Sequence, residues 1–119
     1  MTTAREAFIA KKLRSRYGPV GYVAGLYVKA GYSVRVGVSV GGRSLDILAS
    51  KEGVRLAITV ITGSGTYGRS VVEEAKKLGD ALGAKPVLVL YGSGPKLSEE
   101  AVKAAEELGV SVRRVRPER

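Results

Sequence analysis

One acidic residue stands out because it lies alone in an apolar segment. Asp46 interrupts the run Ser-Leu-Asp-Ile-Leu-Ala-Ser at 44–50, and an almost wholly apolar run follows at 54–61. A carboxylate beside a buried central strand can hold Mg²⁺ for phosphodiester hydrolysis, because this cation prefers oxygen ligands. Asp46 is therefore the candidate catalytic residue and metal ligand. The alternative is a structural acid at a strand end that pairs with Arg43 or Arg55.

The remaining chemistry is limited by residue types that the chain lacks. It contains no His and no Cys. Disulfides, thiolate metal sites and Ser-His or Cys-His nucleophiles are excluded. Among the other acids, Glu73 or Glu74 could complete a relocated metal site with Asp46, although both suit solvent-exposed pairing with Lys76 and Lys77 on a helix.

A glycine-rich segment at 63–68 reads Gly-Ser-Gly-Thr-Tyr-Gly, after an expected strand and before an expected helix. This spacing and context fit a dinucleotide-binding loop. However, no acid stands at the end of the next strand, where ribose recognition requires one. The alternative is that Gly63 and Gly65 present backbone N–H groups to a nucleic-acid phosphate, assisted by Arg69.

The charge of the chain favours a polyanionic partner. The net charge is +9, and it is uneven: residues 1–69 hold 11 Lys and Arg against 3 Asp and Glu, whereas residues 70–119 hold 9 against 8. DNA or RNA is the usual polyanion. The alternative is a generally basic protein from a thermophile, since Asn and Gln are also absent. The expected phosphate-binding side chains are Lys11, Lys12, Arg14, Arg16, Arg43 and Arg69.

The chain is expected to alternate helices and strands that place these residues. Thr2 or Thr3 caps a first helix to about Arg16, Gly18-Pro19 breaks it, and a second helix follows to Gly31. Alternation at 33–40, a Gly41-Gly42 turn and a turn at 51–53 predict a three-strand antiparallel meander. The remaining elements are a loop at 62–68, a helix at 69–82, a strand at 86–91, a loop, a helix from Ser98 to Gly109 and a short last strand.

This order, ααβββαβαβ, predicts one α/β domain over residues 1–119. The strand at 54–61 and the strand at 86–91 are joined by a helix, so they should be parallel. The fold class is therefore a mixed sheet with helices on both faces. The tyrosines at 17, 22, 27 and 32 recur every five residues and are expected in core or interface contacts.

The order of elements and several segments resemble the PD-(D/E)XK, or restriction-endonuclease-like, nucleases. GYSVRVGVSVGGRSLDILA at 31–49 is similar to their strand-turn-strand segment with its metal-binding Asp, and LAITVITG at 56–63 to their Glu-x-Lys strand. The resemblance is greatest to archaeal Holliday-junction resolvases and to RecB-like and Mrr-like members, and it covers residues 4–91. It implies that Asp46 is the metal-binding Asp and that Glu6 matches the acid on the first helix of resolvases.

The same resemblance implies that the catalytic motif is degenerate. Thr59 stands at the Glu position and Ile61 at the Lys position. A neutral hydroxyl and a hydrocarbon cannot supply the second carboxylate and the ammonium group, so we expect little or no nuclease activity. We therefore expect a catalytically inactive nuclease-fold protein that binds DNA or RNA. Its expected role is in DNA repair or recombination, in the cytoplasm of an archaeon.

Three alternatives remain open at this point. One is an active Mg²⁺-dependent endonuclease with relocated ligands; no cofactor is expected otherwise. A second is a noncatalytic subunit of the archaeal tRNA-splicing endonuclease. A third is a nucleotide-binding module on the loop at 63–68. The resemblance implies a homodimer or a heteromeric partner subunit, and no membrane association is expected, because no apolar run reaches a membrane span.

Overall fold

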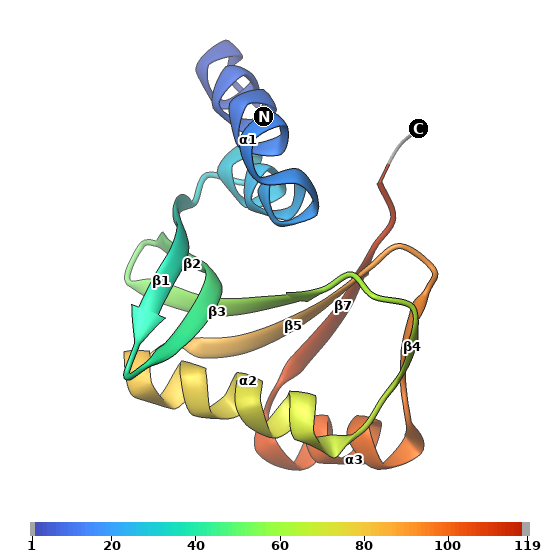
Figure 1. The fold of residues 1–119 in the computed structure, drawn as a ribbon. Helices are drawn as coiled ribbons and strands as arrows, with labels where there is room; N and C mark the ends of the chain where they lie inside the picture. The colour runs from blue at the N-terminus through green and yellow to red at the C-terminus, as the bar shows by residue number, and fades with distance from the viewer. Residues whose placement is uncertain (1, 118–119) are drawn as a thin grey trace.

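The computed structural model describes residues 2–117 and shows a mixed β-sheet between two helical layers (Figure 1). The sheet order is β1-β2-β3-β5-β7. Helix α1 (Ala4–Lys29) covers one face, and helices α2 (Arg69–Leu82) and α3 (Glu99–Leu108) cover the other (Figure 1). The strands of this sheet are β1 (Ser33–Val40), β2 (Arg43–Lys51), β3 (Val54–Ile61), β5 (Lys85–Tyr91) and β7 (Ser111–Val115).

The pairing of the strands follows the sequence pattern. β1, β2 and β3 are antiparallel neighbours joined by short turns, and β3, β5 and β7 are parallel neighbours. Gly41 and Gly42 both have positive φ, as the tight turn between β1 and β2 requires. The predicted meander and the predicted parallel crossover are both confirmed. β3 and β5 lie inside the sheet, which explains why their sequences are almost continuously apolar.

Helix α1 (Ala4–Lys29) consists of two helical segments that fold back on each other. Gly18 interrupts the helix with φ 61° and ψ −132°, a conformation that is essentially restricted to glycine. A Cβ atom on Gly21 would lie 1.8 Å from the carbonyl oxygen of Leu13, and one on Gly25 would lie 3.0 Å from the Cβ of Ala10. Residues 10 and 13 therefore face residues 25 and 21, so the segments 4–17 and 19–29 are antiparallel. The second segment contributes Val23, Ala24 and Tyr27 to the core.

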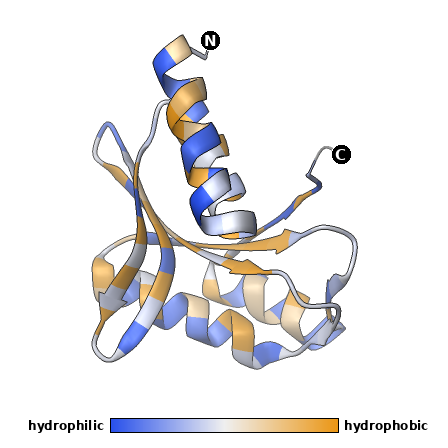
Figure 2. Cartoon of the chain, turned by 45° about the horizontal axis from the view of Figure 1, so that its top comes forward, coloured by the Kyte–Doolittle hydropathy of each residue, from blue (hydrophilic) through white to orange (hydrophobic). Residues whose placement is uncertain are grey.

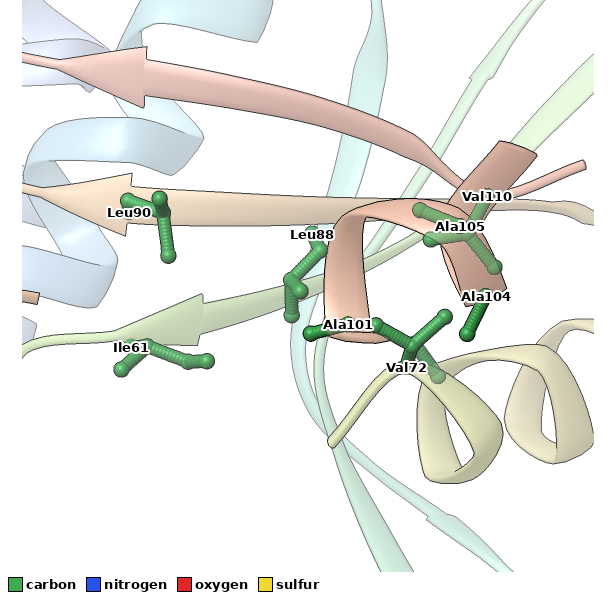
Figure 3. Close-up of a cluster of buried hydrophobic side chains, with 9 residues drawn as sticks. Ile61, Val72, Leu88, Leu90, Ala101, Ala104, Ala105 and Val110 are labelled. Carbon is green, nitrogen blue, oxygen red and sulfur yellow. The ribbon is translucent and has the colours of Figure 1, made fainter. Parts of the chain in front are cut away.

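Helices α2 (Arg69–Leu82) and α3 (Glu99–Leu108) are amphipathic and cover the opposite face. Their small apolar residues pack against β3 and β5, and Figure 3 shows Val72 and Ala101 beside Leu88 in this cluster. Gly83 and Gly109 end the helices in the left-handed conformation, as their place in the sequence predicts. The Ser98 hydroxyl caps α3 by accepting a hydrogen bond from the Ala101 N–H at 3.1 Å.

The two segments expected to be loops contain short strands. β4 (Gly65–Tyr67) and β6 (Pro95–Leu97) pair in parallel as a separate two-stranded sheet. The loop predictions for 62–68 and for the segment after β5 were wrong over these residues, because the two segments hydrogen-bond to each other. Over residues 2–117, none of the helices combines the length and the apolar character that crossing a membrane requires.

Candidate functional site

Asp46 lies where β2 and β3 stop pairing. The paired residues of these strands run from Lys51 and Val54 to Ile47 and Ile58. One step further, the Asp46 Oδ2 atom accepts a hydrogen bond from the Val60 N–H at 2.7 Å. The carboxylate thus takes the place of a backbone carbonyl in satisfying this N–H group, and one of its two oxygens is committed to the fold.

Thr59 lies on the α2 side of the sheet, one position past the last residue of β3 that pairs with β2. Ala57 and Ile61 pack on this side, and residues two positions apart on a strand share a face. In β2, Leu45 and Leu48 both pack in the cluster under α2, so the alternation of faces changes next to Asp46. The Thr59 Oγ1 atom is buried and has no hydrogen-bond partner within residues 2–117. Thr59 therefore offers one neutral hydroxyl to this part of the sheet.

Ile61, at the position expected for a lysine, is part of the hydrophobic core. It is 9% exposed and belongs to the same cluster as Val72 of α2 and Leu88 of β5 (Figure 3). An ammonium group at this position would lose its hydration among hydrocarbon side chains. The packing of Ile61 is therefore that of a core residue, and the position has no polar function.

The surroundings of Asp46 raise the pKa of its carboxyl. Burial raises the pKa of the Asp46 carboxyl above its ordinary value of 3.8, and the hydrogen bond from Val60 opposes this shift by favouring the charged form. A carboxyl beside an arginine would show the opposite direction. Neither Arg43 nor Arg55 pairs with Asp46: Arg43 binds Glu74, and Arg55 donates to the Leu82 carbonyl.

The other candidate acids are engaged in structural contacts. Glu6 forms a capping box with Thr3 at the start of α1, with hydrogen bonds of 2.9 and 3.1 Å. Glu73 pairs with Arg69 at 3.1 Å and Glu74 pairs with Arg43 at 3.2 Å. Neither acid contacts the expected partners Lys76 and Lys77, and Lys76 pairs with Asp80 at 3.0 Å.

The residues present do not fit a divalent cation. Mg²⁺ requires a set of oxygen ligands in near-octahedral arrangement. Within residues 2–117, no group of three Asp, Glu, His or Cys side chains could hold a metal ion. Asp46 is a single carboxylate whose Oδ2 atom already accepts a hydrogen bond, and Thr59 and Ile61 add no charge. No catalytic step through a metal follows from this arrangement.

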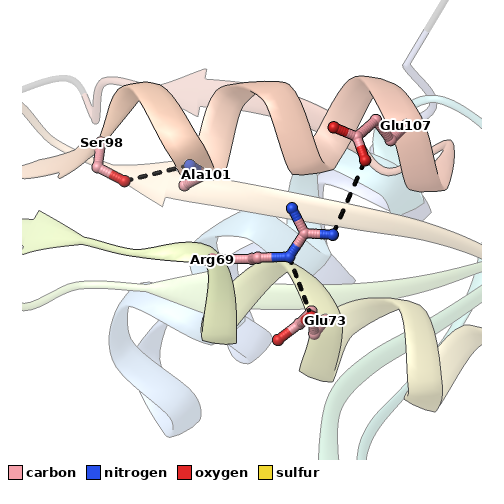
Figure 4. Close-up of polar contacts among 5 residues, drawn as sticks. All are labelled: Arg69, Glu73, Ser98, Ala101 and Glu107. Atoms are coloured by element: carbon pink, nitrogen blue, oxygen red, sulfur yellow. Dashed lines mark hydrogen bonds and ion pairs between the residues drawn. The ribbon is translucent and has the colours of Figure 1, made fainter.

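The six predicted phosphate-binding side chains fall into two groups on opposite sides of the sheet. Arg43 and Arg69 lie on the α2 side and are held by carboxylates; Figure 4 shows Arg69 between Glu73 and Glu107. The other four lie on the first, outer segment of α1 (residues 4–17): Lys11, Lys12, Arg14 and Arg16. None of them has a carboxylate within 4.0 Å in the part of the chain that the structure describes. Figure 2 shows hydrophilic residues along this segment.

The segment at 63–68 differs in geometry from a dinucleotide-binding loop. The Gly65 N–H donates to the Gly94 carbonyl at 3.2 Å, and the Tyr67 hydroxyl donates to the Gly63 carbonyl at 2.8 Å. The segment continues as β4 before α2 begins, so it does not turn directly from strand to helix as the dinucleotide fingerprint requires. At least one of its N–H groups is therefore already used by the fold.

Two features of the site could not be found by looking for charged side chains. The partner of Asp46 is the backbone N–H of Val60, which no side-chain motif reveals. The separation of the basic residues follows from the antiparallel packing of the two α1 segments. A signal for that packing is present in the sequence, since Gly21 and Gly25 stand four positions apart and allow close helix approach.

Comparison with known proteins identifies the fold. No family model matches the chain, and no curated protein matches it. Among solved structures, a protein of unknown function shares 22% identity at a TM-score of 0.67, over 78% of this chain and 54% of that one. A repair endonuclease from Pyrococcus abyssi shares 16% identity at a TM-score of 0.62, over 99% of this chain and 49% of that one. EndoMS in a complex with double-stranded DNA shares 17% identity at a TM-score of 0.54, over 74% of this chain and 38% of that one.

These likenesses confirm the fold that the sequence resemblance predicted. The chain has a restriction-endonuclease-like nuclease fold, with an α+β mixed sheet flanked by helices. It spans about half the length of the solved structures that it matches.

Proposed function

We propose that this nuclease-fold chain binds DNA or RNA without cutting it. The observation that carries the proposal is the packing of Ile61 into the hydrophobic core beside Thr59, whose hydroxyl is neutral. The strand that would present a carboxylate and an ammonium group to a phosphodiester instead completes the interior. Asp46 remains, but it serves the backbone of β3.

The nucleic-acid surface that we propose is the outer segment of α1. Lys11, Lys12, Arg14 and Arg16 lie within six residues, are exposed and are not compensated by nearby carboxylates among the described residues. Aromatic rings steady three of them: Lys12 lies over Phe8, Arg14 over Tyr22 and Arg16 over Tyr17. Cations held in this way lose less side-chain freedom when they bind a phosphate.

Two of the solved neighbours support a nucleic-acid partner by what their names state, namely a repair endonuclease and an enzyme in complex with double-stranded DNA. The distribution of charge supports it independently, because a basic surface releases counterions when it binds a phosphate backbone. A role in DNA repair or recombination, as a homodimer or beside an active subunit, would agree with both.

The test is the salt dependence of binding to fluorescently labelled DNA, measured by anisotropy. The double variant Lys11→Gln/Lys12→Gln should bind more weakly, and the slope of log K against log salt should fall by about 2. The matched control is Lys96→Gln/Lys103→Gln, which removes the same charge from β6 and α3.

Equal losses in the two double variants would show that only net charge matters and would remove α1 as the binding surface. Affinity that does not change between about 50 and 200 mM salt would overturn the electrostatic basis of the proposal altogether.

A further inference from the structure

A pocket lies on the α1 side of the sheet, away from Asp46. It has a volume of about 430 Å³, in the range of small-molecule sites. The second segment of α1 lines it with Leu26 and Tyr27, the sheet forms its floor with Leu56 and Val89, and Lys51 and Arg113 also line it. Its walls are therefore apolar, and its charged groups are both positive.

The two cations retain hydrogen-bonding capacity. The Lys51 ammonium donates to the Ala30 carbonyl at 2.8 Å and lies 5.5 Å from the centre of the Tyr32 ring. Of its three N–H groups, this leaves two without an assigned acceptor. One guanidinium nitrogen of Arg113 donates to the Tyr27 hydroxyl at 3.4 Å. Neither cation has a carboxylate within 4.0 Å among residues 2–117.

The position of Arg113 is fixed by the sheet. It pairs with Val89 across the parallel ladder between β5 and β7, so both side chains lie on the α1 face. Val89 is 1% exposed and belongs to the core under α1. A charged group held beside such a floor can bind an anion, while the apolar body of the same ligand contacts the floor and the wall of α1.

We propose that this pocket binds a small organic anion, in which an apolar body carries one carboxylate, sulfonate or phosphate group. Arg113 binds the anionic group and Lys51 adds to the positive potential. Leu26, Leu56 and Val89 contact the body of the ligand. No acidic side chain lines the pocket within the described chain, which disfavours a cationic ligand.

The experiment compares three probes by ¹H–¹⁵N NMR titration: naphthalene-2-sulfonate, the neutral naphthalene-2-methanol, and inorganic phosphate. The sulfonate should bind at least tenfold more tightly than the other two, because only it satisfies both the cations and the apolar walls. The amide shifts should centre on Leu26, Val89 and Arg113. Arg113→Gln should weaken sulfonate binding about tenfold, and Arg113→Lys should weaken it less.

Arg35→Gln is the matched control, because Arg35 is exposed on β1 and does not line the pocket. It should leave sulfonate affinity unchanged. The proposal is overturned if the alcohol binds as tightly as the sulfonate, if Arg113→Gln and Arg35→Gln have the same effect, or if the shifts map to the outer segment of α1. Shifts there would show that the sulfonate binds the basic surface and not the pocket.

Discussion

Asp46 uses its carboxylate to support the backbone of the neighbouring strand. It lies where β2 and β3 stop pairing, and its Oδ2 atom accepts a hydrogen bond from the Val60 N–H at 2.7 Å. Beside it, the Thr59 hydroxyl is buried without a partner among residues 2–117. The contacts of Asp46 and Thr59 thus belong to strand pairing and to packing.

The first prediction concerns the hydrogen bond from Val60 to Asp46. Asp46→Ala leaves a partly buried backbone N–H without an acceptor, so the free energy of unfolding should fall by about 1–3 kcal/mol. Asp46→Asn keeps an oxygen acceptor and should cost less. Denaturant unfolding of the two variants measures this difference. If Asp46→Ala were as stable as the wild type, the hydrogen bond would contribute nothing.

The second prediction concerns pH. Because burial raises the pKa of Asp46 in the folded state above 3.8, the folded chain binds this proton more tightly than the unfolded chain. The contribution of Asp46 to stability should therefore fall as the pH rises from about 3.8 through the raised pKa, and then level off. Comparing wild type with Asp46→Asn at each pH isolates this group. A difference that grows in favour of the wild type with rising pH would contradict the raised pKa.

The third prediction concerns Thr59. Thr59→Val replaces an unpaired buried hydroxyl with a methyl group of similar size, so the free energy of unfolding should rise by about 1 kcal/mol. Thr66→Val, on an exposed position of β4, should change it by less than about 0.5 kcal/mol. Destabilisation by Thr59→Val would mean that the hydroxyl has a partner and that the interior is more polar here than described.

The elements show which parts of the fold a sequence can predict. The alternation in β1, the apolar runs of β3 and β5, and the glycines after α2 and α3 predicted these elements closely, because each reflects local periodicity or backbone geometry. β4 and β6 could not be predicted in this way, since they are three residues long and each is stabilised by the other. The Gly-Ser-Gly sequence that occurs at both 63–65 and 92–94 was the available signal for their pairing.

The antiparallel packing of the two α1 segments was also missed, although the break at Gly18 was predicted. Helical periodicity places a helix but does not state what it packs against. Contacts between residues 10 and 25 and between 13 and 21 determine which α1 segment lies against the sheet. They therefore also set the separation of Glu6 from Asp46. Sequence periodicity alone therefore could not predict which residues lie near Asp46.

The fourth prediction tests this packing. Gly21→Ala would place a Cβ 1.8 Å from the Leu13 carbonyl oxygen, so the two segments must move apart. The expected loss of stability is about 1–3 kcal/mol or more, despite the gain of about 1 kcal/mol in helix propensity. Gly25→Ala meets only side-chain and backbone atoms at 3.0 Å or beyond and should cost less. If Gly21→Ala were the more stable of the two, the segments could not be in contact as described.

At the scale of the whole molecule, the fold separates two kinds of surface. On the side of α2 and α3, Arg43 and Arg69 are paired with carboxylates of the protein. The opposite side carries the free positive charge on the outer segment of α1. The surface that we propose for nucleic-acid binding is therefore on the other side of the sheet from these paired arginines.

The most direct test of this account is an incubation of the protein with labelled duplex and branched DNA in the presence of Mg²⁺, with binding followed by anisotropy and cutting by denaturing gel. The account predicts binding that weakens steeply with salt, with a slope of about −3 to −4 for four phosphate contacts. It also predicts no cutting beyond that seen with Asp46→Ala. Mg²⁺-dependent cutting by the wild type that is lost in Asp46→Ala, with DNA binding retained, would contradict it.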